Sequence, residues 1–135
     1  VSIQKRTISR AAQEAGVHIE TIRYYERIGL LPRRRTTGGY RVYSEDEVRR
    51  IRFVRNCQAF GFSLSEIKDL LAVRDDASAT CGDVCRPAQE KIEEIESKIR
   101  ALLGIRDELR RLTSCATECI SARECNLMKA AEGPD

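Results

Sequence analysis

The chain has 135 residues, 41% of them hydrophobic and 33% charged, which is enough for one modest domain or for a small domain with an extended element. No apolar run approaches the ~18 to 20 residues of a membrane span, and the first ten residues lack the apolar core of a signal peptide, so we expect a cytoplasmic protein. The net charge of +3 is unevenly distributed: residues 1–75 carry 15 Lys and Arg against 9 Asp and Glu, for +6, whereas residues 76–135 carry 9 against 12, for −3. The basic half is therefore the candidate for binding a polyanion.

Two short helices are predicted near the N-terminus. The first spans about residues 8–15 and stops at Gly16, and the second, in HIETIRYYERIGLL, ends at Gly29. Two helices joined by a tight turn are typical of a helix-turn-helix, whose second helix enters the major groove of DNA. His18, the only histidine, lies in the turn between the two helices. We expect it to act as a helix cap or to contact a phosphate rather than to bind a metal. The residues expected to contact DNA here are His18, Thr21, Arg23, Tyr24 and Arg27.

A basic wing is predicted to follow the second helix. Pro32 blocks helix continuation, Gly38-Gly39 favours a hairpin turn, and residues 40–43 alternate as a strand. A run of arginines alone is often only a surface loop, but beside a helix-turn-helix it favours phosphate contacts. The wing residues expected to contact DNA are Arg33, Arg34, Arg35, Tyr40 and Arg41.

Two more helices complete a compact domain over residues 1–73. Each is expected to begin at a capping box, formed by Ser44 with Glu47 and by Ser63 with Glu66. Cys57, far in sequence from the other cysteines, is interpreted as a small buried hydrophobic residue. The apolar residues expected to face the core are Val48, Ile51, Phe53, Val54, Phe60, Leu64, Ile67, Leu70 and Leu71.

More than half of the chain resembles the N-terminal domain of the MerR family of transcriptional regulators, through its TIRYYE, GLL, GYRVY, IRFVRNCQAFGFSL and EI..LL elements. The resemblance implies a winged helix-turn-helix, a homodimer, and double-stranded promoter DNA whose two recognition elements are too far apart for RNA polymerase. It also implies that the effector-bound dimer underwinds and bends this DNA, so that polymerase is reached indirectly through the DNA. An enzyme is disfavoured, since no cysteine has a plausible partnering base and no Gly-rich phosphate loop is present.

A long helix is predicted over residues 80–113. Its isoleucines and leucines recur at steps of three and four, with charged residues on the other faces. Packing against the N-terminal domain could cover only part of such a helix, so we expect the same helix of a second copy to bury the apolar stripe. The residues of the stripe are Ile92, Ile95, Ile99, Leu102, Ile105, Leu109 and Leu112.

Five of the six cysteines flank this helix: Cys81 and Cys85 at its start, and Cys115, Cys119 and Cys125 beyond its end. In a reducing cytosol, clustered cysteines favour metal or redox chemistry over structural disulfides. Thiolates select soft or borderline ions such as mercury, cadmium, lead, zinc and copper(I). We expect a metal-binding loop and a short helix over residues 114–135.

The family resemblance implies a ligand set. It implies that two long helices pair antiparallel, which places Cys81 of one chain beside the C-terminal cysteines of the other. In the metal-sensing branch, a cysteine at the start of this helix marks sensors of divalent ions, and mercury sensors add two more thiols. The best match is a trigonal trio of Cys81, Cys115 and Cys125, in which Cys115 is offset by one residue from the family pattern, with Cys119 and Cys85 as further candidate ligands. The expected effector is Hg(II), with Cd, Pb or Zn as alternatives.

Three other interpretations stay open. CISAREC resembles the end of the iron-sulfur loop in the SoxR branch, although a cluster needs four thiolates close together. A disulfide switch among the same thiols is the second, and a structural zinc site that only staples the dimer is the third. The predicted fold is mainly α: a winged helix-turn-helix domain, then a long antiparallel coiled-coil dimerisation helix and a C-terminal metal-binding loop.

Overall fold

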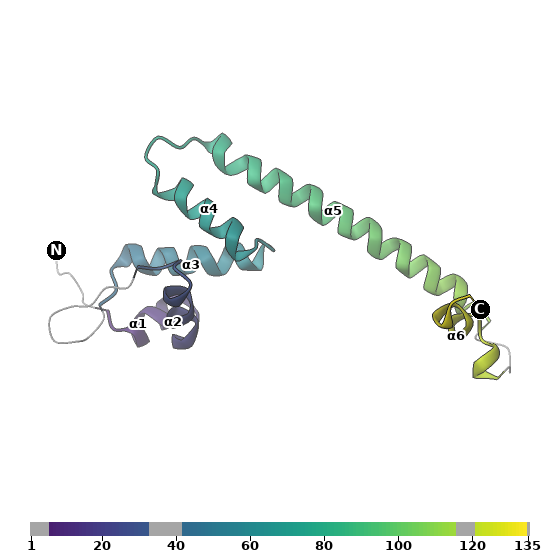
Figure 1. The fold of residues 1–135 in the computed structure, drawn as a ribbon. Helices are drawn as coiled ribbons and strands as arrows, with labels where there is room; N and C mark the ends of the chain where they lie inside the picture. The colour runs from purple at the N-terminus through teal and green to yellow at the C-terminus, as the bar shows by residue number, and fades with distance from the viewer. Residues whose placement is uncertain (1–5, 33–41, 116–120, 135) are drawn as a thin grey trace. The chain divides into compact units, whose positions relative to one another are not determined.

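The computed structural model describes residues 6–32, 42–115 and 121–134 (Figure 1). Within these ranges, no helix is long and apolar enough to cross a membrane. The helices of the described residues are α1 (Ile8–Ala15), α2 (Ile19–Arg27), α3 (Glu45–Ala59), α4 (Leu64–Asp75), α5 (Cys81–Leu112), the 3-10 helix η1 (Ala122–Glu124) and α6 (Asn126–Glu132).

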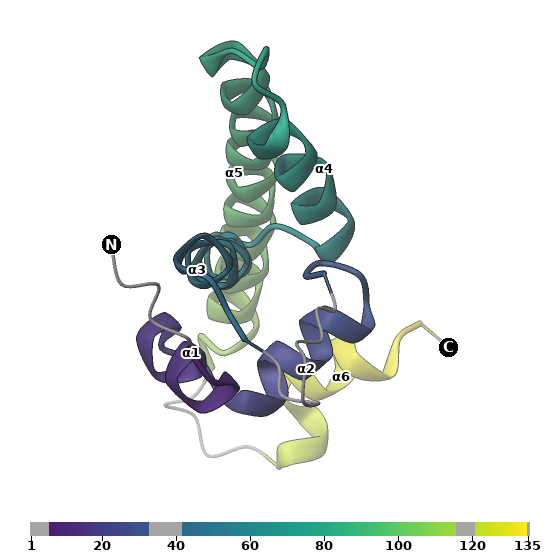
Figure 2. The same cartoon turned by 90° about the vertical axis from the view of Figure 1, so that its left-hand side faces the viewer.

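The chain forms two compact units, Val1–Cys85 and Arg86–Asp135. In the first unit, α3 lies between α4 on one side and the pair α1 and α2 on the other (Figures 1 and 2). The helices enclose a core to which each of α1 to α4 contributes, including the fully buried Ile22, Ile51 and Ile67. The domain predicted over residues 1–73 lies within this unit.

The helix-turn-helix forms where the sequence predicts it. Thr7 caps α1, because its hydroxyl accepts a hydrogen bond from the Arg10 N–H at 3.3 Å. Gly16 ends the helix in the left-handed conformation, with φ of 70°. A Cβ atom at this position would lie 3.0 Å from Nη1 of Arg55. Both the backbone conformation and the close approach of the Arg55 side chain therefore favour glycine.

The next two helices confirm most of the sequence prediction. Ser63 and Glu66 form a complete capping box, with hydrogen bonds of 3.2 and 2.8 Å, and the Ser44 hydroxyl accepts from the Glu47 N–H at 3.1 Å. Of the predicted core residues, Phe53 and Leu64 are only partly buried. The prediction for Phe60 is wrong, since its side chain is 67% exposed. Helix α3 ends at Ala59, so Phe60 no longer continues its inner face.

The predicted wing lies almost entirely outside the described residues, which resume at Val42. At its end, the Tyr43 N–H donates to the Arg6 carbonyl at 2.9 Å, in an isolated antiparallel bridge. This contact fixes the backbone at Tyr43, just before α3 begins.

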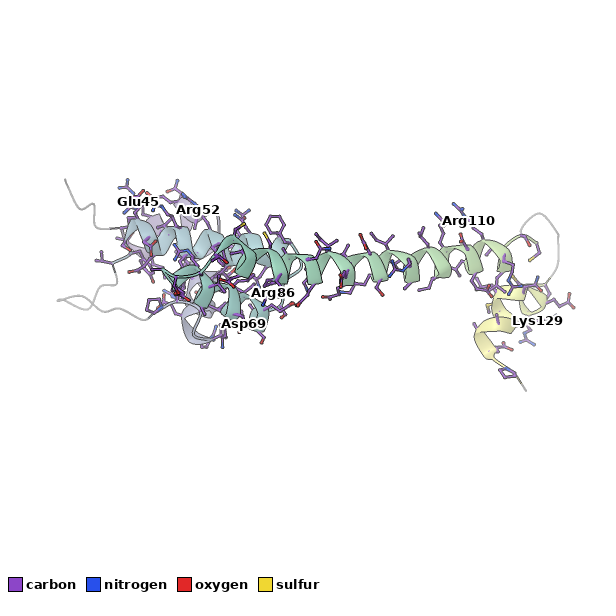
Figure 3. All side chains as sticks on the ribbon, turned by 90° about the horizontal axis from the view of Figure 1, so that it is seen from above. Glu45, Arg52, Asp69, Arg86, Arg110 and Lys129 are labelled. Atoms are coloured by element: carbon purple, nitrogen blue, oxygen red, sulfur yellow. The ribbon has the colours of Figure 1, made fainter. Side chains whose placement is uncertain are left out.

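Helix α5 is continuous over 32 residues and so is about 48 Å long at ~1.5 Å per residue. Its apolar stripe is exposed: Ile95 is 41% exposed, Ile99 48% and Leu102 65%. Leu112 differs, being buried at the end of the helix. Side chains stand out around the helix, including the labelled Arg86 and Arg110 (Figure 3). Along most of its length, the stripe predicted from the heptad-like spacing is therefore not buried by any of the described residues.

Candidate nucleic-acid interface and metal centre

One face of α2 is held firmly by the core. Ile22, Tyr25 and Glu26 are 0%, 2% and 5% exposed. The Tyr25 hydroxyl donates to Oε1 of Gln58 at 2.6 Å, and the Tyr43 hydroxyl donates to Oε1 of Glu26 at 2.6 Å. Burial raises the pKa of the Tyr25 phenol. These bonds tie α2 to α3 and to Tyr43, which fixes the direction in which the other face of α2 points.

The outer face of α2 carries the residues that the sequence predicts to contact DNA. Arg23, Tyr24 and Arg27 are exposed, and Thr21 is partly exposed. The Arg27 guanidinium lies 5.7 Å from the centre of the Tyr24 ring, and Arg23 pairs with Glu20 at 2.7 Å. A guanidinium stacked near an aromatic ring has a restricted orientation, which suits it to a fixed phosphate or base edge.

His18 is exposed and occupies the N-cap position of α2, but its side chain makes no capping hydrogen bond. The backbone carbonyl of His18 accepts instead from the N–H groups of Thr21 and Ile22, at 3.0 and 3.4 Å. His18 therefore caps the helix through its extended backbone, and the imidazole takes no part in capping. A phosphate contact stays a prediction.

A cluster around Glu14 positions α1 and was not predicted. The Arg6 and Arg10 guanidiniums donate to the Glu14 carboxylate at 2.7 and 3.2 Å, and Arg52 donates to the Glu14 backbone carbonyl at 3.1 and 2.8 Å. Burial opposes ionisation, but the hydrogen bonds from Arg6 and Arg10 prevail and lower the pKa of Glu14. The four-residue spacing of Arg10 and Glu14 indicates their pairing. The Arg52 contact spans 38 residues, and no local pattern reveals it.

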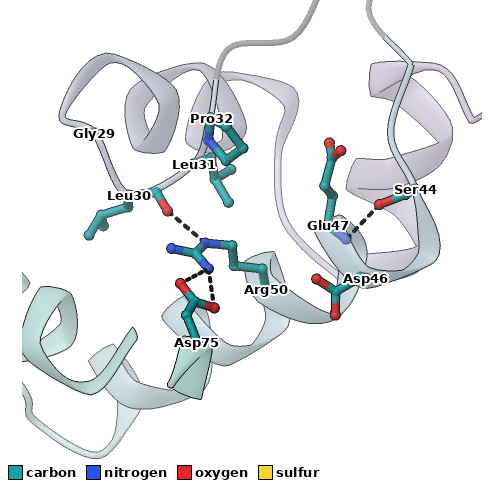
Figure 4. A pocket seen from close by; sticks show the side chains of 9 residues that line it. All are labelled: Gly29, Leu30, Leu31, Pro32, Ser44, Asp46, Glu47, Arg50 and Asp75. Carbon is teal, nitrogen blue, oxygen red and sulfur yellow. Dashed lines mark hydrogen bonds and ion pairs between the residues drawn. The ribbon is translucent and has the colours of Figure 1, made fainter. Parts of the chain in front are cut away.

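A second unpredicted contact links three helices beside a hollow of about 760 Å³ (Figure 4). Arg50 on α3 donates through Nε to the Leu30 carbonyl at 3.0 Å and through Nη1 to both Asp75 oxygens at 2.9 and 2.8 Å. Leu30 lies just beyond α2, and Asp75 is the last residue of α4. Arg50 thus connects the segment just beyond α2 to the end of α4, the helix that leads to α5. The hollow is lined by Gly29, Leu30, Leu31, Pro32, Ser44, Asp46, Glu47, Arg50 and Asp75.

Two exposed thiols lie together at the start of α5. Sγ of Cys81 is 3.4 Å from Sγ of Cys85, one helical turn later. The hydrogen bond with Cys81 holds the pKa of Cys85 above its ordinary value. The N–H and hydroxyl of Thr80 donate to the Asp83 carboxylate at 2.8 and 3.2 Å, which fixes this end of the helix.

Two more thiols meet beyond the end of α5. Sγ of Cys115 lies 3.9 Å from Sγ of Cys125, and both residues are partly buried. The Leu127 N–H contributes most to lowering the pKa of Cys125; burial opposes this effect, and Cys115 and the Met128 N–H add to it. With a metal–sulfur bond of about 2.3 Å, this separation corresponds to a sulfur–metal–sulfur angle of about 116°, between tetrahedral and trigonal values. The pair therefore fits a thiophilic metal as two ligands of a larger set.

The predicted trio is only partly assembled within one chain. The structure pairs Cys115 with Cys125 and Cys81 with Cys85, and Cys119 lies outside the described residues. No group of three His, Cys, Asp or Glu side chains among the described residues could hold a metal ion. Cys57 is buried as predicted, and burial raises its pKa.

Comparison with known proteins identifies the family. The model of MerR HTH family regulatory proteins matches residues 6–73, and the model described as MerR, DNA binding matches residues 48–112. The mercuric resistance operon regulatory protein of Bacillus cereus is 41% identical over 126 residues, covering 93% of this chain and 96% of the relative.

Two solved structures extend the likeness to the whole fold. The transcription regulator PbrR691 from Ralstonia metallidurans CH34, in complex with lead(II), has a TM-score of 0.81 at 31% identity, covering 93% of this chain and 98% of that one. The dual-function regulator MerR from Bacillus megaterium MB1, in complex with mercury(II), has a TM-score of 0.68 at 37% identity, covering 90% and 94%. With its helix-turn-helix, long α5 and flanking thiols, the chain belongs to the MerR family of helix-turn-helix transcriptional regulators.

Proposed function

We propose that this protein is a metal-responsive transcriptional regulator that binds promoter DNA as a homodimer, with Hg(II) as its effector. The main support for this proposal is the Cys115–Cys125 pair, whose sulfur atoms are 3.9 Å apart, a separation that suits two ligands of one soft ion. A relative named for mercuric resistance, and structures holding mercury(II) or lead(II), support metal sensing. Cd, Pb and Zn are the alternative effectors.

The homodimer is supported by the exposed stripe of α5. Burying isoleucine and leucine side chains that are 41–65% exposed stabilises an interface at roughly 25 cal/mol per Å² of apolar area. A second α5 has the same spacing of apolar residues and so matches the stripe along its length. In an antiparallel pair, the start of each helix of about 48 Å lies beside the end of the other.

That pairing completes the ligand set. Cys115 and Cys125 supply two thiolates, and the partner subunit's Cys81 supplies the third. Two such sites form in each dimer, and each depends on both chains. Cys119 and Cys85 are available as additional ligands. Three soft donors without a histidine select thiophilic ions over harder ones.

DNA is bound by the outer face of α2 and by the wing. Thr21, Arg23, Tyr24 and Arg27 meet phosphates and base edges in the major groove, and His18 meets the backbone. The wing residues Arg33, Arg34, Arg35, Tyr40 and Arg41 add phosphate contacts. Because each neutralised phosphate releases counterions, binding weakens steeply as salt rises.

The response to metal is allosteric. Joining Cys81 to thiols of the partner subunit moves the start of α5 and the turn that precedes it. The Arg50–Asp75 pair carries this movement to the Leu30 carbonyl, at the end of the DNA-facing helix. A coupling of about 1 to 3 kcal/mol between metal binding and the deformed DNA is typical of such systems.

The test is a Hg(II) titration of the reduced dimer against a competing small thiol, together with transcription from the cognate promoter. Serine replaces Cys81, Cys115, Cys119 and Cys125 in turn, and Cys57→Ala serves as the buried control. We expect Cys81→Ser, Cys115→Ser and Cys125→Ser each to weaken Hg(II) binding and to abolish activation, whereas Cys57→Ala keeps both. An affinity for Hg(II) that is unchanged by Cys81→Ser contradicts the intersubunit site.

Two other outcomes identify the alternatives. Purified protein that contains iron and is coloured favours the cluster. Metal binding that leaves transcription unchanged favours a structural site.

A further inference from the structure

We propose that Cys81 and Cys85 form a second, two-sulfur metal site within a single chain, which takes up the thiophilic ion before the intersubunit site is completed. The inference rests on the proposed function, because it assigns an entry step to the same effector. Its physical basis is separate, since it depends only on two thiols of α5 whose sulfur atoms are 3.4 Å apart.

The pair is placed to meet an incoming ion first. Cys81 and Cys85 are both exposed, whereas Cys115 and Cys125 are partly buried. The four-residue spacing keeps both thiols on one face of the helix whenever α5 is formed. The Thr80–Asp83 hydrogen bonds hold this first turn in its helical conformation. The dithiol is therefore preorganised without a partner subunit.

The sulfur separation also indicates how the site differs from the Cys115–Cys125 pair. For two sulfur atoms 3.4 Å apart, each bonded to one metal ion at about 2.3 Å, the sulfur–metal–sulfur angle is about 95°, which is below the tetrahedral value. Linear two-coordination needs the sulfurs about 4.6 Å apart at this bond length. Exposed cysteine side chains reach that separation by moving between χ1 rotamers, which is not restricted by core packing. The dithiol suits two-coordinate capture better than tight three-coordinate binding.

Capture from a cellular thiol is a balanced ligand exchange. A mercury(II) ion carried by two glutathione thiolates is transferred to Cys81 and Cys85, so that two mercury–sulfur bonds form and two break. The two cysteine protons pass to the released glutathione thiolates, and nothing is oxidised or reduced. The second bond forms within one molecule, at an effective concentration in or above the millimolar range, so the dithiol competes with free glutathione. Because Cys81 belongs to both sites, the ion reaches the partner's Cys115 and Cys125 without full release.

The test uses the full chain with Cys115, Cys119 and Cys125 all replaced by serine, so that the pair and the buried Cys57 remain. The reduced protein is mixed with Hg(II) in millimolar glutathione and its mass is measured under denaturing conditions. We expect an adduct of one mercury per chain, two hydrogens lighter than the sum and free of glutathione. Adding Cys85→Ser should lower this bridged adduct by about tenfold or more, leaving a mixed protein–mercury–glutathione species. Adding Val84→Ser, an exposed neighbour on the same turn, should leave it unchanged.

Any of three results overturns the inference. The chain with the three serine substitutions forms only the mixed glutathione species, the bridged adduct survives Cys85→Ser, or one mercury joins two chains. The proposed function fails on a different measurement, when the chain with all its cysteines binds Hg(II) without a change in transcription. In the chain with all other cysteines present, Cys85→Ser should slow the uptake of Hg(II) from glutathione, and an unchanged rate also contradicts an entry site.

Discussion

Replacing Tyr43 by phenylalanine tests whether the hydrogen bond between Tyr43 and Glu26 stabilises the packing of α2. The hydroxyl donates to Oε1 of Glu26 at 2.6 Å, and the two residues are only 4% and 5% exposed. Losing a hydrogen bond to a buried carboxylate costs about 1.5 to 3 kcal/mol, because water cannot replace the donor. The loss is a large fraction of a typical domain stability of roughly 5 to 15 kcal/mol.

The assay for Tyr43→Phe is urea unfolding at a fixed protein concentration, since a dimer's apparent stability depends on concentration. Tyr24→Phe is the matched control, because it removes the same hydroxyl from a side chain of α2 that is 39% exposed. We expect the control to lie within about 0.5 kcal/mol of the parent. A cycle with Glu26→Gln measures the coupling between the two groups. Equal unfolding free energies for the Tyr43 and Tyr24 variants refute the reasoning.

Three further predictions concern the dimer, the DNA and the link between them. Ile99→Glu should shift the protein toward monomer in analytical ultracentrifugation, whereas Ser97→Glu, the same change at another exposed position of α5, should not; equal dimerisation of the two contradicts the stripe. Arg27→Ala should weaken DNA binding and reduce the slope of log affinity against log salt by about 1, measured by fluorescence anisotropy, and an unchanged slope removes Arg27 from the phosphate contacts. Arg50→Lys keeps the charge, but its single nitrogen cannot replace both Nε, which bonds the Leu30 carbonyl, and Nη1, which bonds both Asp75 oxygens. Hg(II) binding should therefore persist while transcriptional activation falls. Full activation rules out this route of coupling.

The helices of the first unit could be predicted because their signals are local. Gly16, Ser44 and Ser63 mark helix ends by backbone conformation or capping, and these requirements act within four residues. The prediction for Phe60 is wrong because periodicity does not show where a helix stops. The contacts made by Arg50 join residues separated by 20 and 25 positions, and they depend on how the helices pack.

The thiols show the same limit. The four-residue spacing of Cys81 and Cys85 on a helix predicts their proximity. Cys115 and Cys125 lie close together beyond the end of α5, and their ten-residue separation in sequence does not by itself specify this. The two pairs belong to different units, because Cys81 and Cys85 lie at the start of α5, whereas Cys115 and Cys125 lie beyond its end.

The central claim is that one metal site is built from two chains, and a mixed dimer tests it most directly. One subunit carries Cys81→Ser and the other carries Cys115→Ser with Cys125→Ser, both in a Cys85→Ser background that removes the single-chain dithiol. We expect the mixed dimer to retain one Hg(II), held by Cys81 of one subunit and Cys115 and Cys125 of the other, at a glutathione concentration that removes Hg(II) from both parental homodimers. A mixed dimer that retains no more Hg(II) than the homodimers would contradict the account.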